Sequence, residues 1–172
     1  MSLGKAVSQN VIFVADKMKT SFFSEARMEN IDAISTTGST AAINATNKDV
    51  AFKISILSFR FKNSLMEEHF NENYMDSNKF PYGIFKGKIL DEVDLTKEGR
   101  YPVTVDGTFE LHGISKPRKF AGVIENKAGL LFLDSEFMMP VADHKIDIPN
   151  DKLSNISQII KVTLHAEFIR KK

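Results

Sequence analysis

The feature that most constrains the fold is a two-residue alternation of apolar and polar side chains that recurs along the chain. Within residues 102–112, polar residues alternate with a second set that is apolar or small, namely Val103, Val105, Gly107, Phe109 and Leu111. Successive side chains of an extended strand point to opposite faces. The pattern therefore predicts a strand with one face in a core and the other in solvent.

The same alternation marks three more segments, and each has one apolar face. These faces are Val50, Phe52, Ile54 and Ile56; Leu131, Leu133, Ser135, Phe137 and Met139; and Ile160, Val162, Leu164, Ala166 and Phe168. Weaker patterns between turn signals predict further strands at about 18–24, 26–34, 39–45, 82–90 and 117–126. About eight or nine such strands predict an all-β fold, either a closed antiparallel barrel or a sandwich.

Two features interrupt the alternation. Phe59 and Phe61 are out of register with Ile56 by one residue, which predicts a bulge or a strand end near Leu57-Ser58. Residues 64–76 instead have helical spacing, and Ser64 followed by Glu67 has the form of a capping box. One amphipathic helix is therefore expected there, packing on the barrel or closing one end.

In that helix, Met66, Phe70 and Tyr74 lie at i, i+4 and i+8, so they are expected to face the protein. Glu67 and Asn71 are expected to face solvent. No linker, repeat or low-complexity tract divides residues 1–172, which are interpreted as a single domain. Met1-Ser2-Leu3 has the form of a tag remnant, and residues 1–10 are expected to be a tag or a flexible N-terminus.

Charge and composition exclude several classes of function. The 23 basic residues nearly balance the 22 acidic ones, so no overall field favours nucleic acid, and no such partner is expected. No stretch approaches 18 consecutive apolar residues, so the chain is not expected to span a membrane with a helix. The chain has no cysteine, which removes thiolate metal sites and cysteine nucleophiles. No cofactor is expected.

The densest polar cluster is on the predicted helix and contains Glu68, His69 and Glu72. No second histidine lies four residues from His69, so the favoured interpretation is a solvated helix face. A metal or acid–base enzyme that uses this cluster is the alternative. His144, between Asp143 and Lys145, is interpreted as a loop residue.

Two groups of basic residues could contact an anionic head group, although solubilising charge is the favoured interpretation. They are Lys86 with Lys88, and Lys116, Arg118 and Lys119. The chain also contains 14 Phe but no Trp, which is a large apolar content for a barrel of this size. A small barrel either fills its interior with side chains or holds one small ligand, and composition leaves both open.

Two linked segments resemble the YceI-like family. The first runs from Leu65-Met66-Glu67-Glu68-His69-Phe70 into Lys79-Phe80-Pro81-Tyr82-Gly83-Ile84-Phe85-Lys86-Gly87. The second, Val105-Asp106-Gly107-Thr108-Phe109-Glu110-Leu111-His112-Gly113-Ile114-Ser115-Lys116-Pro117, resembles the family's "G-x-L-x-x-H-G-x-[ST]-K" hairpin. The resemblance covers residues 18–169. It implies a single antiparallel, eight-stranded, lipocalin-like barrel that holds a long polyisoprenoid-type lipid in its pore.

The expected function is thus non-enzymatic binding or transport of an isoprenoid or related long-chain lipid. The expected ligand-binding residues are the inward candidates of four strands: Phe52, Ile54, Phe85, Gly87, Ile89, Gly107, Phe109, Leu111, Val162 and Leu164. Gly87 and Gly107 are among them because glycine leaves room where a ligand approaches. A structural or stress-related barrel with a filled core is a second alternative.

Many family members are secreted to the bacterial periplasm, so a periplasmic or secreted location is expected, with a signal peptide already removed. The assembly is left open between a monomer and a homodimer. The resemblance has one departure, because the strand that carries "Asp-x-x-His-Ser" in relatives reads Lys19-Thr20-Ser21-Phe22-Phe23-Ser24 here and lacks the histidine. A head-group contact made by that histidine is not carried over.

Overall fold

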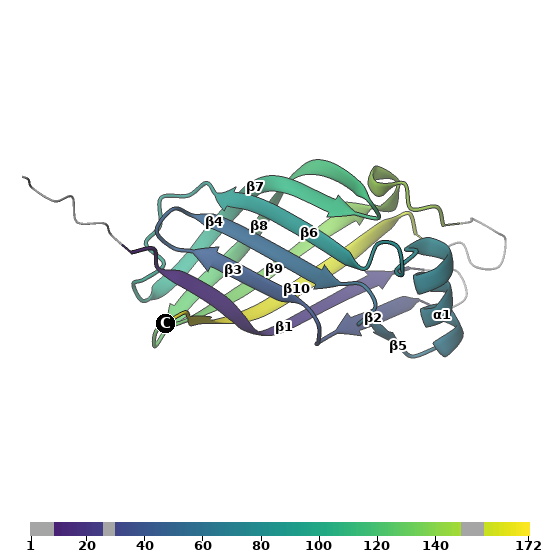
Figure 1. Ribbon diagram of the computed structural model, residues 1–172, viewed down its shortest axis with the longest axis horizontal. Coiled ribbons are helices and arrows are strands. Elements are labelled where there is room, and N and C mark those ends of the chain that lie inside the picture. The colour runs from purple at the N-terminus through teal and green to yellow at the C-terminus, as the bar shows by residue number, and fades with distance from the viewer. Residues whose placement is uncertain (1–8, 26–29, 149–156) are drawn as a thin grey trace, which may run out of the picture.

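The strands of the chain form one antiparallel sheet that closes on itself, as the computed structural model shows (Figure 1). The structure describes residues 9–25, 30–148 and 157–172. The strands are β1 (Ile12–Ser24), β2 (Ile31–Ser35), β3 (Thr40–Asn44), β4 (Asp49–Ser55), β5 (Arg60–Phe61), β6 (Tyr82–Ile89), β7 (Gly99–Leu111), β8 (Ile114–Lys127), β9 (Leu130–Pro140) and β10 (Ile159–Arg170).

The barrel wall has the neighbour order β10-β9-β8-β7-β6-β4-β3-β1, and pairing of β1 with β10 closes it. The short strands β2 and β5 extend two of these wall positions. The first residues of β1 pair with β3, and its last residues, from Thr20 to Ser24, pair with β2. Strands β2 and β3 therefore follow one another along the same edge of β1. The prediction of a closed, eight-stranded antiparallel barrel is confirmed.

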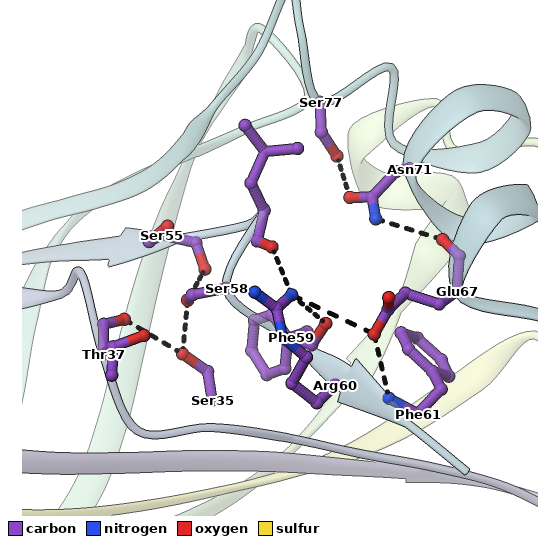
Figure 2. A network of polar contacts seen from close by, with 11 residues as sticks. Ser35, Thr37, Ser55, Ser58, Phe59, Arg60, Phe61, Glu67, Asn71 and Ser77 are labelled. Atoms are coloured by element: carbon purple, nitrogen blue, oxygen red, sulfur yellow. Dashed lines mark hydrogen bonds and ion pairs between the residues drawn. The ribbon is translucent and has the colours of Figure 1, made fainter. Parts of the chain in front are cut away.

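The predicted interruption near Leu57-Ser58 is a strand end. β4 stops at Ser55, and β5 begins at Arg60 and pairs with β2. Side chains replace the ladder in the gap, since Ser58 Oγ donates to the Ser55 carbonyl at 2.8 Å and also contacts Ser35 Oγ (Figure 2). The interruption returns Phe59 to the interior, where it is 4% exposed.

One helical segment of two parts lies across one end of the barrel (Figure 1). α1 (Ser64–His69) is followed by a wider π-helical turn, η1 (Phe70–Tyr74), so the predicted helix is present. The predicted capping box is wrong, because the N-cap is Asn63. Its side-chain oxygen accepts hydrogen bonds from the backbone N–H of Leu65 and Met66, at 2.9 and 3.2 Å, which satisfies two donors of the first turn.

Two polar side chains of this helix form hydrogen bonds within the protein. Glu67 accepts a hydrogen bond from the backbone N–H of Phe61 at 3.2 Å. Asn71 donates to the Glu67 carbonyl at 3.0 Å and accepts from Ser77 Oγ at 2.7 Å (Figure 2). Both residues are half-buried, so the expectation that they point to solvent is wrong. They fasten the helix to β5 and to the segment that follows η1.

The end of the barrel away from α1 is closed by packed side chains. Leu95, in the loop between β6 and β7, is fully buried in the larger apolar cluster together with Phe13 and Phe168. Asn126 is 4% exposed and donates to the Leu95 carbonyl at 2.7 Å, which ties this loop to β8. This end is therefore a filled core.

Most predicted strands match the observed ones within a few residues. The main difference is β1, which begins at Ile12 rather than near residue 18, and which has a register shift between Ala15 and Lys17. Part of the strand expected at 26–34, and most of the expected tag at 1–10, lie outside the described residues. The division of the chain into one domain stays a prediction.

Candidate functional site

An apolar cavity of about 150 Å³ lies inside the barrel, beneath the helical segment. The helix contributes Met66, Phe70 and Tyr74 to its lining, so the predicted inward face of the helix is the roof of the cavity. The walls come mainly from β1, β9 and β10 and from the segment 141–148, and β2, β4, β5, β6 and β7 contribute one residue each. The atoms that line the space are apolar, so the cavity offers water no partners and suits an apolar guest.

A second cavity of about 90 Å³ lies deeper in the barrel. Phe52, Phe85, Phe109 and Phe120 are among its lining residues. Three residues line both cavities and so separate them: Ile54, Phe137 and Leu164. The two cavities thus lie one behind the other inside the barrel, between the roof helix and the filled core.

The size of each cavity sets what it can hold without rearrangement. An apolar cavity of about 150 Å³ accepts a guest the size of benzene. Both cavities are smaller than the roughly 300–1,000 Å³ of typical ligand pockets. A long chain therefore fits only if the side chains between the cavities turn aside, and Ile54, Phe137 and Leu164 are those side chains.

A group of aromatic rings borders the upper cavity next to the roof. The ring centroid of Phe70 lies 5.3 Å from that of Phe22, 6.0 Å from that of Phe59 and 5.1 Å from that of Phe61. These rings belong to η1, β1, β5 and the segment before β5. Movement of the helical segment would consequently change the shape of the upper cavity.

Seven of the ten predicted ligand-binding residues line the cavities. Leu111 and Val162 line the upper one, Ile54 and Leu164 line both, and Phe52, Phe85 and Phe109 line the lower one. Ile89 is 3% exposed and lies in the larger apolar cluster, outside both linings. That any of the ten contacts a ligand stays a prediction.

The other two predicted residues, Gly87 and Gly107, lie opposite each other on β6 and β7 and line neither cavity. A Cβ atom added at Gly107 would lie 2.5 Å from Gly87 Cα and closer still to the Lys86 carbonyl oxygen. A Cβ atom at Gly87 would lie 2.5 Å from the Asp106 carbonyl oxygen. Glycine is thus required at both positions because two strand backbones approach closely.

Several residues that line the upper cavity are not among the ten predicted ligand-binding residues. The sequence predicts that Met66, Phe70 and Tyr74 face the protein and that Phe137 lies on an apolar strand face. The spacing of these four residues was therefore enough to identify them as candidate lining residues. Val141, Ile146 and Ile148 were not identified, because the alternation in their segment is limited to Lys145-Ile146-Asp147-Ile148 and is too short to predict a strand. These three residues belong to the same apolar cluster as Phe70 and Tyr74 of the helical segment.

His144, interpreted from sequence as a loop residue, is fully buried in a short 3₁₀ helix, η2 (Val141–His144). Its Nδ1 donates to the Ile114 carbonyl at 2.9 Å, while Nε2 has no hydrogen-bond partner among the described residues. Burial lowers the pKa of His144 below 6.5, and the nearby Arg118 cation lowers it further. The imidazole is therefore neutral at neutral pH, and η2 is held against the turn between β7 and β8.

Glu68, His69 and Glu72 do not converge into a metal site. Within residues 9–25, 30–148 and 157–172, no group of three or more His, Cys, Asp or Glu side chains could hold a metal ion. Glu68 and Glu72 are exposed, and His69 is half-buried. In the same part of the chain, no helix has the length and apolar character needed to cross a membrane.

A sequence model of the YceI-like domain matches residues 5–168, nearly the whole chain. The chain belongs to the YceI-like domain family. A search among curated proteins found no match. The family membership confirms the resemblance seen in the two sequence segments.

Solved structures with the same fold agree with this YceI-like assignment. A polyisoprenoid binding domain from Saccharophagus degradans, implicated in plant cell wall breakdown, has a TM-score of 0.80 at 12% identity, over 95% of this chain and 100% of that chain. Burkholderia cenocepacia BcnA has a TM-score of 0.70 at 12% identity, over 87% and 95% of the two chains. The Campylobacter jejuni YCEI protein has a TM-score of 0.62 at 18% identity, over 85% and 88%. At these identities the comparisons show a shared fold.

Proposed function

We propose that this YceI-like protein binds a long apolar lipid of the polyisoprenoid type in its barrel and carries it without chemical change. The observation that carries the proposal is the upper cavity, whose lining atoms are apolar and which the helical segment roofs. The printed name of the Saccharophagus degradans relative, a polyisoprenoid binding domain, supports the choice of ligand class. Each CH₂ group moved from water into such a cavity contributes about 0.8 kcal/mol.

The arrangement of the cavities favours a flexible chain over a compact ligand. A prenyl or acyl chain can occupy the upper cavity, pass between Ile54, Phe137 and Leu164, and continue into the lower one. The space seen in the structure is smaller than such a chain, so binding requires the residues between the cavities, or the roof helix, to move. A rigid ligand of the same volume would gain nothing from the second cavity.

The test uses a residue that lines both cavities. In Leu164→Trp the indole should fill the passage and leave the β10 pairing in place. Affinity for a prenyl alcohol that carries a fluorescent anthraniloyl group should fall by about tenfold or more. The loss of two buried CH₂ groups already corresponds to roughly that factor.

The matched control is Ile169→Trp, on the same strand, because Ile169 is 43% exposed. It should leave the affinity unchanged, and urea unfolding of both variants shows whether each is folded. Mass spectrometry of solvent extracts from the gently purified protein identifies the natural ligand. Equal binding by Leu164→Trp and the parent would refute the passage, and no binding by the parent would favour the structural or stress-related barrel with a filled core.

Two further points concern the cellular location and the oligomeric state of the protein. A periplasmic or secreted location stays a prediction, and the assembly stays open between a monomer and a homodimer. Cell fractionation tests the first, and light scattering of the purified protein tests the second. The alternative enzyme hypothesis requires His69, so loss of a measured activity in His69→Ala would support it.

A further inference from the structure

The barrel wall is open between β8 and β9 along part of their length. The two strands pair only from Gly122 with Ser135 to Lys127 with Leu130. Beyond Ser135, β9 continues to Pro140 with β10 as its partner, and β8 runs back to Ile114 with β7 as its partner. Side chains bridge the gap, since Ser135 Oγ donates to the Ala121 carbonyl at 2.7 Å. We call this gap, between residues 114–121 and 136–140, the seam.

Arg118 is on the inner face of β8 at the seam. It shares the alternation of Phe120, Gly122 and Ile124, and its side chain is 16% exposed. Its guanidinium carbon lies 5.3 Å from the ring centroid of Phe120 and 6.0 Å from that of Phe137. A cation is thus held against the two rings that border the lower cavity, and Phe137 also borders the upper one.

The hydrogen-bonding capacity of Arg118 is largely unused. Nη2 donates to the Met138 carbonyl at 2.9 Å, across the seam. The nearest acid is Asp143, whose carboxylate lies 3.8 Å from Nη1, longer than the 2.7–2.9 Å of a charge-assisted hydrogen bond. A guanidinium has five N–H donors, and the described residues give Arg118 this one hydrogen bond.

The charges of the residues around Arg118 favour an anion as its ligand. Asp143 is half-exposed and can turn away, and two more cations, Lys116 and Lys119, are exposed on the same strand. The one acid of β9 in the seam, Glu136, is paired with Lys161 at 3.5 Å. A phosphate or carboxylate can accept two parallel hydrogen bonds from a guanidinium, which an uncharged hydroxyl cannot do.

We propose that the seam is the head-group site of the bound lipid, with Arg118 as the residue that binds an anionic head while the chain lies in the cavities. The inference rests on the proposed lipid binding and narrows the ligand to amphipathic lipids with a phosphate or carboxylate end. The ring centroids of Phe120 and Phe137 lie 4.4 Å apart, so the chain reaches the cavities from Arg118 only when these two rings separate.

The experiment compares three probes by calorimetry: farnesyl phosphate, farnesol and inorganic phosphate. The parent protein should bind farnesyl phosphate at least about tenfold more tightly than farnesol. In Arg118→Met, which keeps much of the apolar stem, farnesyl phosphate should lose roughly ten- to hundredfold in affinity while farnesol changes less than about twofold. Asp143→Asn should tighten farnesyl phosphate binding and leave farnesol unchanged, because a competing carboxylate is removed.

The matched control is Arg100→Met, since Arg100 is 69% exposed and pairs with Glu125 at 3.5 Å, away from the seam. It should change neither affinity. Equal affinity of the parent for the alcohol and the phosphate would overturn the head-group site while leaving lipid binding intact. Equal losses for both probes in Arg118→Met would also overturn it, as would inorganic phosphate binding as tightly as farnesyl phosphate. If the parent binds neither farnesyl probe, the proposed function fails together with this inference.

Discussion

Replacing Gly107 by alanine should destabilise the barrel even though alanine adds a single methyl group. The new Cβ atom would lie 2.5 Å from Gly87 Cα, and ordinary van der Waals contact begins at 3.4 Å, so β6 and β7 must separate by nearly 1 Å there. Neighbouring strands lie about 4.7–4.9 Å apart, so this is close to a fifth of their spacing. The shift should weaken about two ladder hydrogen bonds, each with a net contribution of about 0.5–1.5 kcal/mol. The expected loss in the free energy of unfolding is therefore about 1–3 kcal/mol.

The matched control is Gly83→Ala, which is also in β6. Its added Cβ atom would meet a Leu111 methyl carbon at 3.3 Å and the Phe109 ring at 3.6 Å, and both are side-chain atoms that can adjust. This variant should stay within about 0.5 kcal/mol of the parent, because alanine also restricts the unfolded chain. Urea unfolding followed by far-UV circular dichroism measures both values. Equal losses for the two variants, or a loss below about 0.5 kcal/mol for Gly107→Ala, would refute the close-approach argument.

Three further predictions concern stability. The folded protein holds His144 neutral, with a pKa below 6.5. The free energy of unfolding should therefore have its full value above pH 6.5 and fall as the pH drops from 6.5 toward the folded-state pKa, by at most about 1.4 kcal/mol per pH unit. In a plot of the urea midpoint against pH, His144→Gln should flatten that part of the curve. Asn126→Ala should cost about 1–3 kcal/mol in urea unfolding, because it leaves the Leu95 carbonyl without its donor, and an unchanged midpoint would contradict this. Phe70→Ala should lower the free energy of unfolding by about 1–3 kcal/mol, because the half-buried ring borders a cavity. A fully buried phenylalanine would lose about 3–5 kcal/mol, so a loss above about 4 kcal/mol in urea unfolding would show that the ring is tightly packed.

The wall of the barrel was predictable from sequence because each strand buries one face, and burial on one face imposes a period of two. The inward positions of Phe52, Phe109 and Leu164 followed from that period alone. The helix was predictable from its spacing, but its cap was not, because Asn63 and Ser64 are both good capping residues and the path of the chain decides between them.

The parts that sequence did not predict depend on contacts between distant segments. The charge of Arg118 favoured its interpretation as solubilising charge, but its side chain is 16% exposed and lies against the Phe120 ring, a contact that the sequence pattern does not reveal. The charged neighbours of His144 suggested a loop, while the contact with Ile114 buries it. The close approach at Gly107 was not predictable, because the pattern of a single strand does not show how near the next backbone lies.

The pairing of β1 with β10 has a consequence for how the chain is made. These strands meet at ten positions and join nearly the first described residues to nearly the last. A ribosome releases β1 long before β10, so the N-terminal strand emerges with an unpaired edge that only the final segment can cover. The nascent chain therefore cannot close its barrel before β10 has emerged, and closure should be slow because it joins strands that are far apart in the sequence.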